Sequence, residues 1–104
     1  MKKPETALVE KIIDRLKAEG GFWVKIHGGP MQQAGIPDII GCYHKRFVGI
    51  EVKVGDNKPS KLQKIVLDEL LQAGSRCGVA YTLSQALGIR DGDENWGEQR
   101  QNFS

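Results

Sequence analysis

Apolar residues recur along this chain with two different spacings, and the first of these is helical. Between residues 4 and 19 they return every three or four positions, at Leu8, Val9, Ile12, Ile13 and Leu16. This spacing places them on one face, which is typical of a helix packed on a core. A proline at position 4 suits the first turn, and glycines at positions 20 and 21 end the helix.

The second spacing alternates and predicts strands at 22–27, 37–43, 47–54 and 76–82. A second helix is expected from Ser60 to about Ala73, and Ser84 is expected to cap a short final helix. The first three strands are close enough in sequence for an antiparallel meander, whereas the fourth follows a helical crossover that favours parallel pairing. The predicted class is α/β, an α-β-β-β-α-β core with a central mixed sheet flanked by helices.

The chain of 104 residues is long enough for one domain with a single modest core. We expect this domain to span residues 1–90. Residues 91–104 form a polar, acidic tail in which Trp96 and Phe103 are the large apolar side chains. The tail is interpreted either as a frayed terminus or as an arm that docks on a neighbouring subunit.

Charge is unevenly distributed along the chain. The net charge is +2, and residues 91–104 carry a balance of −3, which leaves +5 on residues 1–90. A mildly basic body fits contact with a polyanion, and it also fits an ordinary soluble protein. We expect no signal peptide and no membrane partner, because no apolar run approaches membrane-spanning length. Cys42 and Cys77 stand singly without metal-ligand spacing, which predicts buried thiols in a reducing compartment.

The candidate chemistry begins with three charged residues on two adjacent strands. Asp38 stands at the head of one strand, and Glu51 and Lys53 share one face of the next. Buried charges are costly unless they pair or hold a metal. A Glu51–Lys53 ion pair would satisfy this rule, and so would a metal site that includes Asp38.

Two further polar residues lie on helix faces that are otherwise apolar. Glu5 continues the apolar stripe of the first helix by one turn, so it is a candidate site residue or a simple complement to the helix dipole. Gln63 forms a capping box with Ser60, which is a complete structural explanation, yet it also lies one turn before the buried face of its helix.

Two loops are open to interpretation. Residues 28–35 are too glycine-rich for a regular element and could follow a sugar-phosphate backbone or serve as a mobile connector. They match neither the P-loop nor the dinucleotide pattern. Residues 44–46 form a basic turn that is either a solvated hairpin tip or a phosphate contact. The single histidines at 27 and 44 are not expected to be metal ligands.

Several of these residues form an ordered pattern. Gly35-Ile36-Pro37-Asp38 is followed by Glu51-Val52-Lys53, with Glu5 before them and Gln63 after. This pattern resembles the VRR-NUC (virus-type replication-repair nuclease) domain of the PD-(D/E)xK nuclease superfamily, over roughly residues 5 to 84. The resemblance implies a restriction-endonuclease-like core and a divalent-metal-dependent DNA endonuclease. Structure selectivity of the Holliday-junction-resolvase type would follow. The alternatives are a non-catalytic nucleic-acid-binding module of the same fold and a flap, nick or single-strand nuclease.

The resemblance also assigns roles to these residues. Asp38, Glu51 and the backbone carbonyl of Val52 would hold Mg²⁺, for which Mn²⁺ can substitute, because hard oxygen donors suit these ions. Glu5 would contact the metal through water or complete a second site. Lys53 would orient or help deprotonate the attacking water, and Gln63 would position that water or Lys53.

The expected partner is DNA, in branched form, bound by a homodimer in the cytoplasm of a bacterial or phage-infected cell. The residues expected to contact the nucleic acid are polar, basic or glycine, at Lys25, Gly28, Gly29, Gln32, Gln33, Lys45, Arg46, Lys58 and Lys61.

Overall fold

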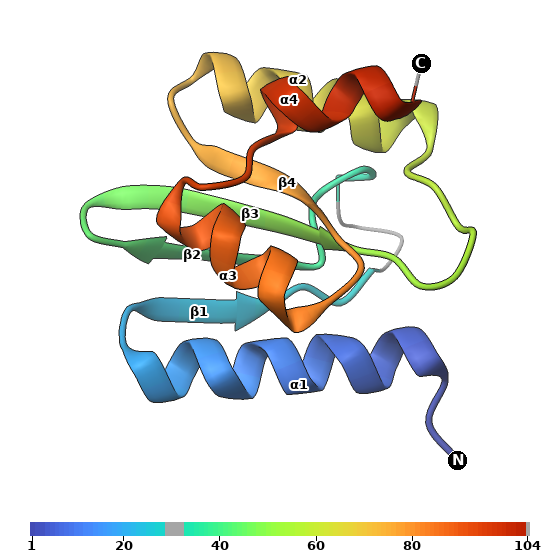
Figure 1. Ribbon diagram of the computed structural model, residues 1–104, viewed down its shortest axis with the longest axis vertical. Coiled ribbons are helices and arrows are strands. Elements are labelled where there is room, and N and C mark those ends of the chain that lie inside the picture. The colour runs from blue at the N-terminus through green and yellow to red at the C-terminus, as the bar shows by residue number, and fades with distance from the viewer. Residues whose placement is uncertain (29–32, 104) are drawn as a thin grey trace.

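The structure is a computed structural model that describes residues 1–28 and 33–103. Within this part of the chain, four strands form one sheet in the order β1-β2-β3-β4 (Figure 1). They are β1 Phe22–Lys25, β2 Ile39–Tyr43, β3 Arg46–Val52 and β4 Arg76–Ala80. The helices are α1 Pro4–Glu19, α2 Lys61–Gln72, α3 Leu83–Asp91 and α4 Trp96–Gln99, followed by a 3₁₀ helix at Arg100–Phe103. The predicted order of the core is confirmed, and each strand is one or two residues shorter than predicted.

The pairing of the strands also follows the prediction. β1 with β2 and β2 with β3 are antiparallel, and β3 with β4 is parallel. Tyr43 pairs with Arg46, which leaves a two-residue turn at His44 and Lys45. Both turn residues have positive φ, 50° and 67°, as the tight hairpin turn that matches strand twist requires.

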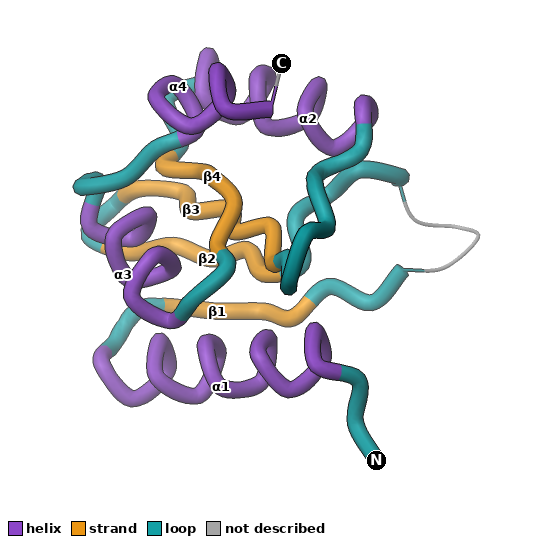
Figure 2. Tube along the Cα trace, turned by 45° about the vertical axis from the view of Figure 1, so that its right-hand side comes forward, coloured by secondary structure: helices purple, strands orange, loops and turns teal. Residues whose placement is uncertain are grey.

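Helices cover both faces of the sheet, so the core has two parts (Figure 2). The larger part joins α1 and α3 to the face that carries Val48, Ile50 and Val52. The smaller part joins α2 and α4 to Cys77 and Val79 on the opposite face. β3 lies between the two parts, and its residues 48–52 are all buried. No helix among the described residues is long and apolar enough to cross a membrane.

The second core part does not extend across the whole sheet. Cys77 is buried, as predicted, but the prediction that Cys42 is buried is wrong. Cys42 lies in register between Phe22 of β1 and Phe47 of β3, and both phenylalanines are exposed, at 68% and 41%. The three side chains form a row across an open stretch of the sheet face, which the alternation of the strand could not reveal.

The C-terminal tail packs on its own chain. Trp96 is 1% exposed in the second core part, and its indole Nε1 donates to Asp68 Oδ1 of α2 at 2.7 Å. Lys64 Nζ of α2 donates to the carbonyl oxygen of Phe103 at 2.8 Å. The expectation of a frayed terminus or of an inter-subunit arm through Trp96 is therefore wrong, because this side chain is already buried against α2 and β4.

The cap of α3 also differs from the prediction. The backbone N–H of Gln85 donates to Thr82 Oγ1 at 3.1 Å, so Thr82 is the N-cap and Ser84 lies inside the helix. Threonine and serine both serve as N-caps, and spacing alone did not distinguish the two positions.

Side-chain amides occupy the outer edge of β4. Gln99 of α4 accepts from the Val79 N–H at 2.8 Å and donates to the Val79 carbonyl at 2.9 Å. Gln85 of α3 accepts from the Tyr81 N–H at 2.6 Å. These two glutamines satisfy backbone groups that an edge strand otherwise leaves unpaired.

We predict that Trp96→Ala lowers the free energy of unfolding by about 3–5 kcal/mol, as for other buried aromatic truncations. The reason is the loss of the α2–α4 core contact together with the bond to Asp68. Chemical denaturation of the purified protein measures this change, with the exposed Asp93→Ala as the control. A loss below about 1 kcal/mol would mean that the tail contributes little to the fold.

Candidate active site

The strand register brings Asp38 and Glu51 together. Ile39 of β2 pairs with Ile50 of β3, and one further step of this antiparallel register places Asp38 opposite Glu51. Directly opposite residues point to the same face of a sheet. Asp38 also continues the ladder toward β1, because its carbonyl oxygen accepts from the Ile26 N–H at 2.8 Å. The predicted pair of acids is therefore adjacent.

A backbone bond holds the Asp38 carboxylate in place. Its Oδ2 accepts from the Val52 N–H at 2.8 Å. Continuing the register would set Val52 opposite Pro37, which lies before the start of β2. The carboxylate thus binds the Val52 N–H just beyond the end of the β2 ladder.

Gly35 explains why a glycine precedes the Pro-Asp pair. Its φ is +87°, a conformation that costs other residues free energy. A Cβ at this position would lie 2.9 Å from Val66 Cγ2 and 3.1 Å from Leu62 Cγ, both on α2. The loop before Asp38 therefore packs directly on α2, and no side chain fits between them.

Glu51 is a buried acid with an unsatisfied oxygen. It is 2% exposed, and its Oε2 has no hydrogen-bond partner among the described residues. Burial raises the pKa of Glu51 far above its usual range. The adjacent Asp38 carboxyl raises this pKa further, whereas the positive charge of Lys53 lowers it and the more distant Glu5 raises it slightly.

The unsatisfied Glu51 oxygen beside the Asp38 carboxylate fits a hard divalent cation. Mg²⁺ is commonly held by one or two carboxylates and completes its shell with waters and substrate phosphate. Within residues 1–28 and 33–103, no group of three or more His, Cys, Asp or Glu side chains is placed to hold a metal ion. The residues therefore fit a two-carboxylate site, in which Glu5 is not a third direct ligand.

Glu5, in the first turn of α1, lies near Asp38. It lines a hollow of about 100 Å³ together with Lys25 and Asp38. Thr6 lines the same hollow, and the sequence analysis missed it because an uncharged first-turn threonine has no distinctive pattern. Glu5 and Lys25 therefore lie beside Asp38. Their roles at the proposed site stay predictions.

Gln63 forms the predicted capping box. Its Oε1 accepts from the Ser60 N–H at 2.8 Å, and the Gln63 N–H donates to Ser60 Oγ at 3.2 Å. The structural interpretation is thus confirmed. The catalytic role stays a prediction, because the side-chain oxygen is engaged in the cap.

Apart from Lys25, the residues predicted to contact nucleic acid fall into three groups. Gly28 and Gln33 line a hollow of about 290 Å³ beside Asp38, while Gly29 and Gln32 lie outside the described residues. Two exposed lysines, Lys58 and Lys61, lie where the chain passes from β3 into α2.

The third group, Lys45 and Arg46, is at the other end of the sheet. β2 runs from the acids to this hairpin over five residues, or about 17 Å of extended chain. Their predicted phosphate contact is therefore remote from Asp38 and Glu51.

The sequence matches no protein-family model and no curated protein. Among solved structures, it is similar to one described as a VRR_NUC domain, with a TM-score of 0.71 and 20% identity. The similarity covers 86% of this chain and 97% of that one. The chain has the fold of a VRR_NUC domain. The predicted fold class is confirmed by this match.

Beside the VRR_NUC core lies a basic cavity that the sequence analysis missed. It has a volume of about 430 Å³ and is lined by Lys61, Lys64 and Arg100 around Phe103. Arg100 also binds Asp68, with Nη2 3.2 Å from Oδ2. The signal was hidden because Arg100 belongs to a tail that is acidic on average, and only folding brings it to α2.

We predict that Glu51→Gln stabilises the metal-free protein at pH 8 by about 1–3 kcal/mol. The folded carboxyl keeps its proton to higher pH than the unfolded one, so folding takes up a proton above about pH 4.5 and stability falls as pH rises. Glutamine has no such dependence, and the advantage should vanish near pH 4.5. Thermal melting in chelator at both pH values, with the exposed Glu69→Gln as control, tests this. An equal effect of Glu51→Gln at both pH values would contradict the desolvation of Glu51.

Proposed function

We propose that this protein is a divalent-metal-dependent DNA endonuclease that hydrolyses phosphodiester bonds. The observation that carries the proposal is the pair of acids, Asp38 and Glu51, of which Glu51 is buried with an unsatisfied oxygen. Lys53 directly follows the end of β3 and is close enough to lower the Glu51 pKa. The description of the fold neighbour as a VRR_NUC domain supports the same reaction class.

The residues divide the work as follows. Asp38, Glu51 and the Val52 carbonyl would hold Mg²⁺ or Mn²⁺. The chemistry that such an ion would supply when bound is a water of lowered pKa and positive charge beside the phosphate. The Lys53 ammonium orients the attacking water and stabilises negative charge that develops on the phosphoryl oxygens. Glu5 contacts the site through water, and Gln63 positions the nucleophilic water or Lys53.

A non-catalytic DNA-binding module is the competing interpretation. Such a module gains nothing from two adjacent acids beside its DNA surface, because they repel phosphate. A buried carboxyl with an unsatisfied oxygen also costs stability. A catalytic metal ion held by the two acids would reduce both the repulsion of phosphate and the cost of burying the carboxyl.

We predict that Asp38→Asn, Glu51→Gln and Lys53→Ala each reduce cleavage of supercoiled plasmid at least about 100-fold. Cleavage should require Mg²⁺ or Mn²⁺, stop in EDTA and be poorly supported by Ca²⁺, which is larger and less demanding in geometry. Lys17→Ala on the exposed side of α1 should cut at the parental rate. Cleavage in excess chelator, or a site variant within a few-fold of the parent, would contradict the assignment.

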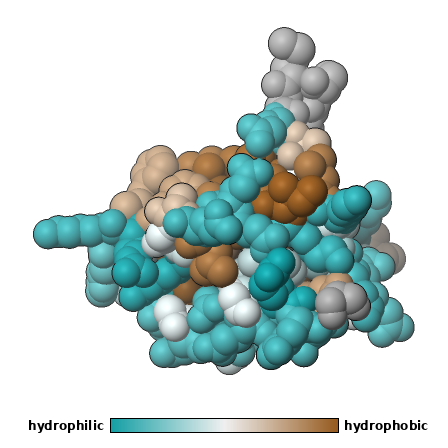
Figure 3. All heavy atoms as spheres, turned by 90° about the horizontal axis from the view of Figure 1, so that it is seen from above, coloured by the Kyte–Doolittle hydropathy of each residue, from teal (hydrophilic) through white to brown (hydrophobic). Residues whose placement is uncertain are grey.

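The substrate is proposed to be branched DNA, bound by a homodimer. A small chain has little surface for reading sequence, and paired cuts need two metal sites in a fixed relation, which a two-fold dimer provides. Apolar side chains are available for the subunit contact. Phe22, Val24 and Phe47 are exposed on the open sheet face, and Leu62 and Ile65 are exposed on α2. Seen from above, apolar side chains gather in one region (Figure 3).

We predict that the parent sediments as a dimer and makes paired nicks in a four-way junction. Phe22→Glu should yield monomers that nick without pairing, since a charge at a 68% exposed apolar position opposes association more than folding. Lys11→Ala on the exposed side of α1 makes the same net change of charge and is the control. A monomeric parent that cuts linear duplex as readily as a junction would remove the proposal.

A further inference from the structure

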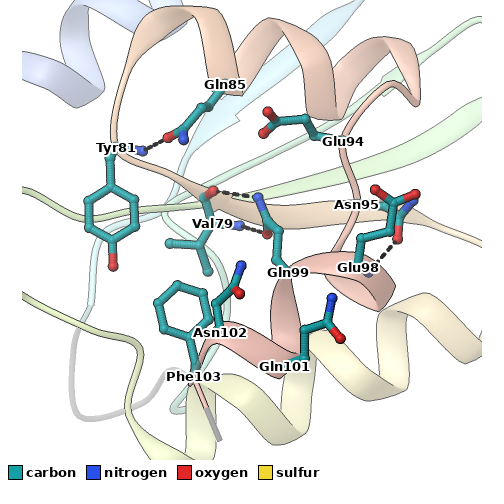
Figure 4. A pocket seen from close by; sticks show the side chains of 10 residues that line it. All are labelled: Val79, Tyr81, Gln85, Glu94, Asn95, Glu98, Gln99, Gln101, Asn102 and Phe103. Carbon is teal, nitrogen blue, oxygen red and sulfur yellow. Dashed lines mark hydrogen bonds between the residues drawn. The ribbon is translucent and has the colours of Figure 1, made fainter.

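The C-terminal segment closes a cavity against the outer edge of β4 (Figure 4). Its volume is about 440 Å³, within the range of small-molecule sites. The walls come from the end of β4, the first turn of α3 and residues 94–103. The metal site proposed above does not use this cavity.

Two aromatic rings form one side of the cavity. The ring centroids of Tyr81 and Phe103 are 6.5 Å apart and their planes differ by 17°. Figure 4 shows them side by side with their faces turned the same way. Tyr81 Oη donates to the Asn57 carbonyl at 2.7 Å, and Phe103 stacks behind on Trp96 at 5.9 Å. The two rings are thus nearly parallel, and aromatic faces stack nucleobases of any sequence.

The rest of the cavity lining is mostly polar and not basic. Amides of Gln85, Gln99 and Asn102 and carboxylates of Glu94 and Glu98 line it. The lining residues that the structure describes include no lysine or arginine. A phosphate is therefore a poor ligand for the cavity, whereas the donor and acceptor edge of a nucleobase finds both partner types.

The cavity adjoins the proposed catalytic residues. Val52 pairs with Ala80, and Lys53 N–H donates to the Ala80 carbonyl at 3.1 Å. One further step of this parallel register places Tyr81 beside Lys53. On the other side of Phe103 lies the basic cavity of Lys61, Lys64 and Arg100. A nucleotide with its base on Tyr81 and Phe103 would thus have basic groups near its phosphate.

We propose that this cavity binds the base of an unpaired nucleotide that flanks the scissile phosphate. The inference rests on the proposed nuclease function and narrows its substrates to DNA with an unpaired nucleotide at or beside the branch point. A base inside a duplex cannot reach the rings without leaving the stack, so paired DNA gains nothing from this subsite.

Binding to the full-length Asp38→Asn protein tests the subsite without cleavage. The probes are a single-stranded oligonucleotide with one 2-aminopurine and the paired duplex of the same sequence. Stacking on the rings should quench the 2-aminopurine. Phe103→Leu, which keeps apolar bulk but removes the ring, should weaken single-strand binding about 10-fold and remove the quenching. Duplex affinity should change less than about two-fold, because a paired base does not reach the rings.

A second cavity variant is needed in case Phe103→Leu does not fold. Asn102 is exposed, so Asn102→Glu should fold normally and still weaken single-strand binding by adding charge to the cavity. Gln72→Glu, exposed at the end of α2, makes the same charge change elsewhere and should have little effect. Parental affinity and quenching in both cavity variants would overturn the subsite.

Plasmid cleavage by the parent shows whether a negative result concerns the base-binding subsite or the nuclease proposal. If the parent cuts plasmid but the cavity variants bind like the parent, the subsite alone is wrong. If single-strand binding follows the expected pattern but nothing is cut, the cavity stands as a base-binding site and the nuclease proposal fails.

Discussion

The burial of the Glu51 carboxyl beside Asp38 is the constraint around which the structure is arranged. Asp38 is fixed by the Val52 N–H, and the preceding loop is pressed onto α2 at Gly35. An acid held in this way is costly in the metal-free protein, because no described group satisfies its Oε2. A bound cation, as proposed above, would offset this cost.

Much of this arrangement could be predicted because it depends on local periodicity and on strand order. Alternation identified β3, and the lengths of the connections gave the meander and the parallel β4. The step from Ile39–Ile50 to Asp38–Glu51 follows from register, so two acids separated by a hairpin could be assigned to one site from the sequence. The capping box of α2 was predictable for the same reason, since its bonds join Ser60 to Gln63.

The misses concern contacts between segments distant in sequence. A single Trp96 in a polar stretch has no periodicity, and its burial depends on α2, through Asp68, and on the side of β4. The exposure of Cys42 depends on how far α2 extends across the sheet, which no strand pattern records. Lys45 and Arg46 are a different case, because they lie near the acids in sequence but at the opposite end of β2 and β3, where the hairpin reverses direction. Their predicted phosphate contact stays a prediction.

The amide of Gln99 has a consequence for how the chain behaves in solution. The amide accepts from the N–H and donates to the carbonyl of Val79, as the backbone of one residue in a neighbouring strand would do. A variant truncated before α4 would lose these two hydrogen bonds and the packing of Trp96 on β4. The backbone groups at the edge of β4 would then be unpaired, so strand pairing between molecules would compete with the native state. Helix α4 thus also protects the protein against self-association through the sheet.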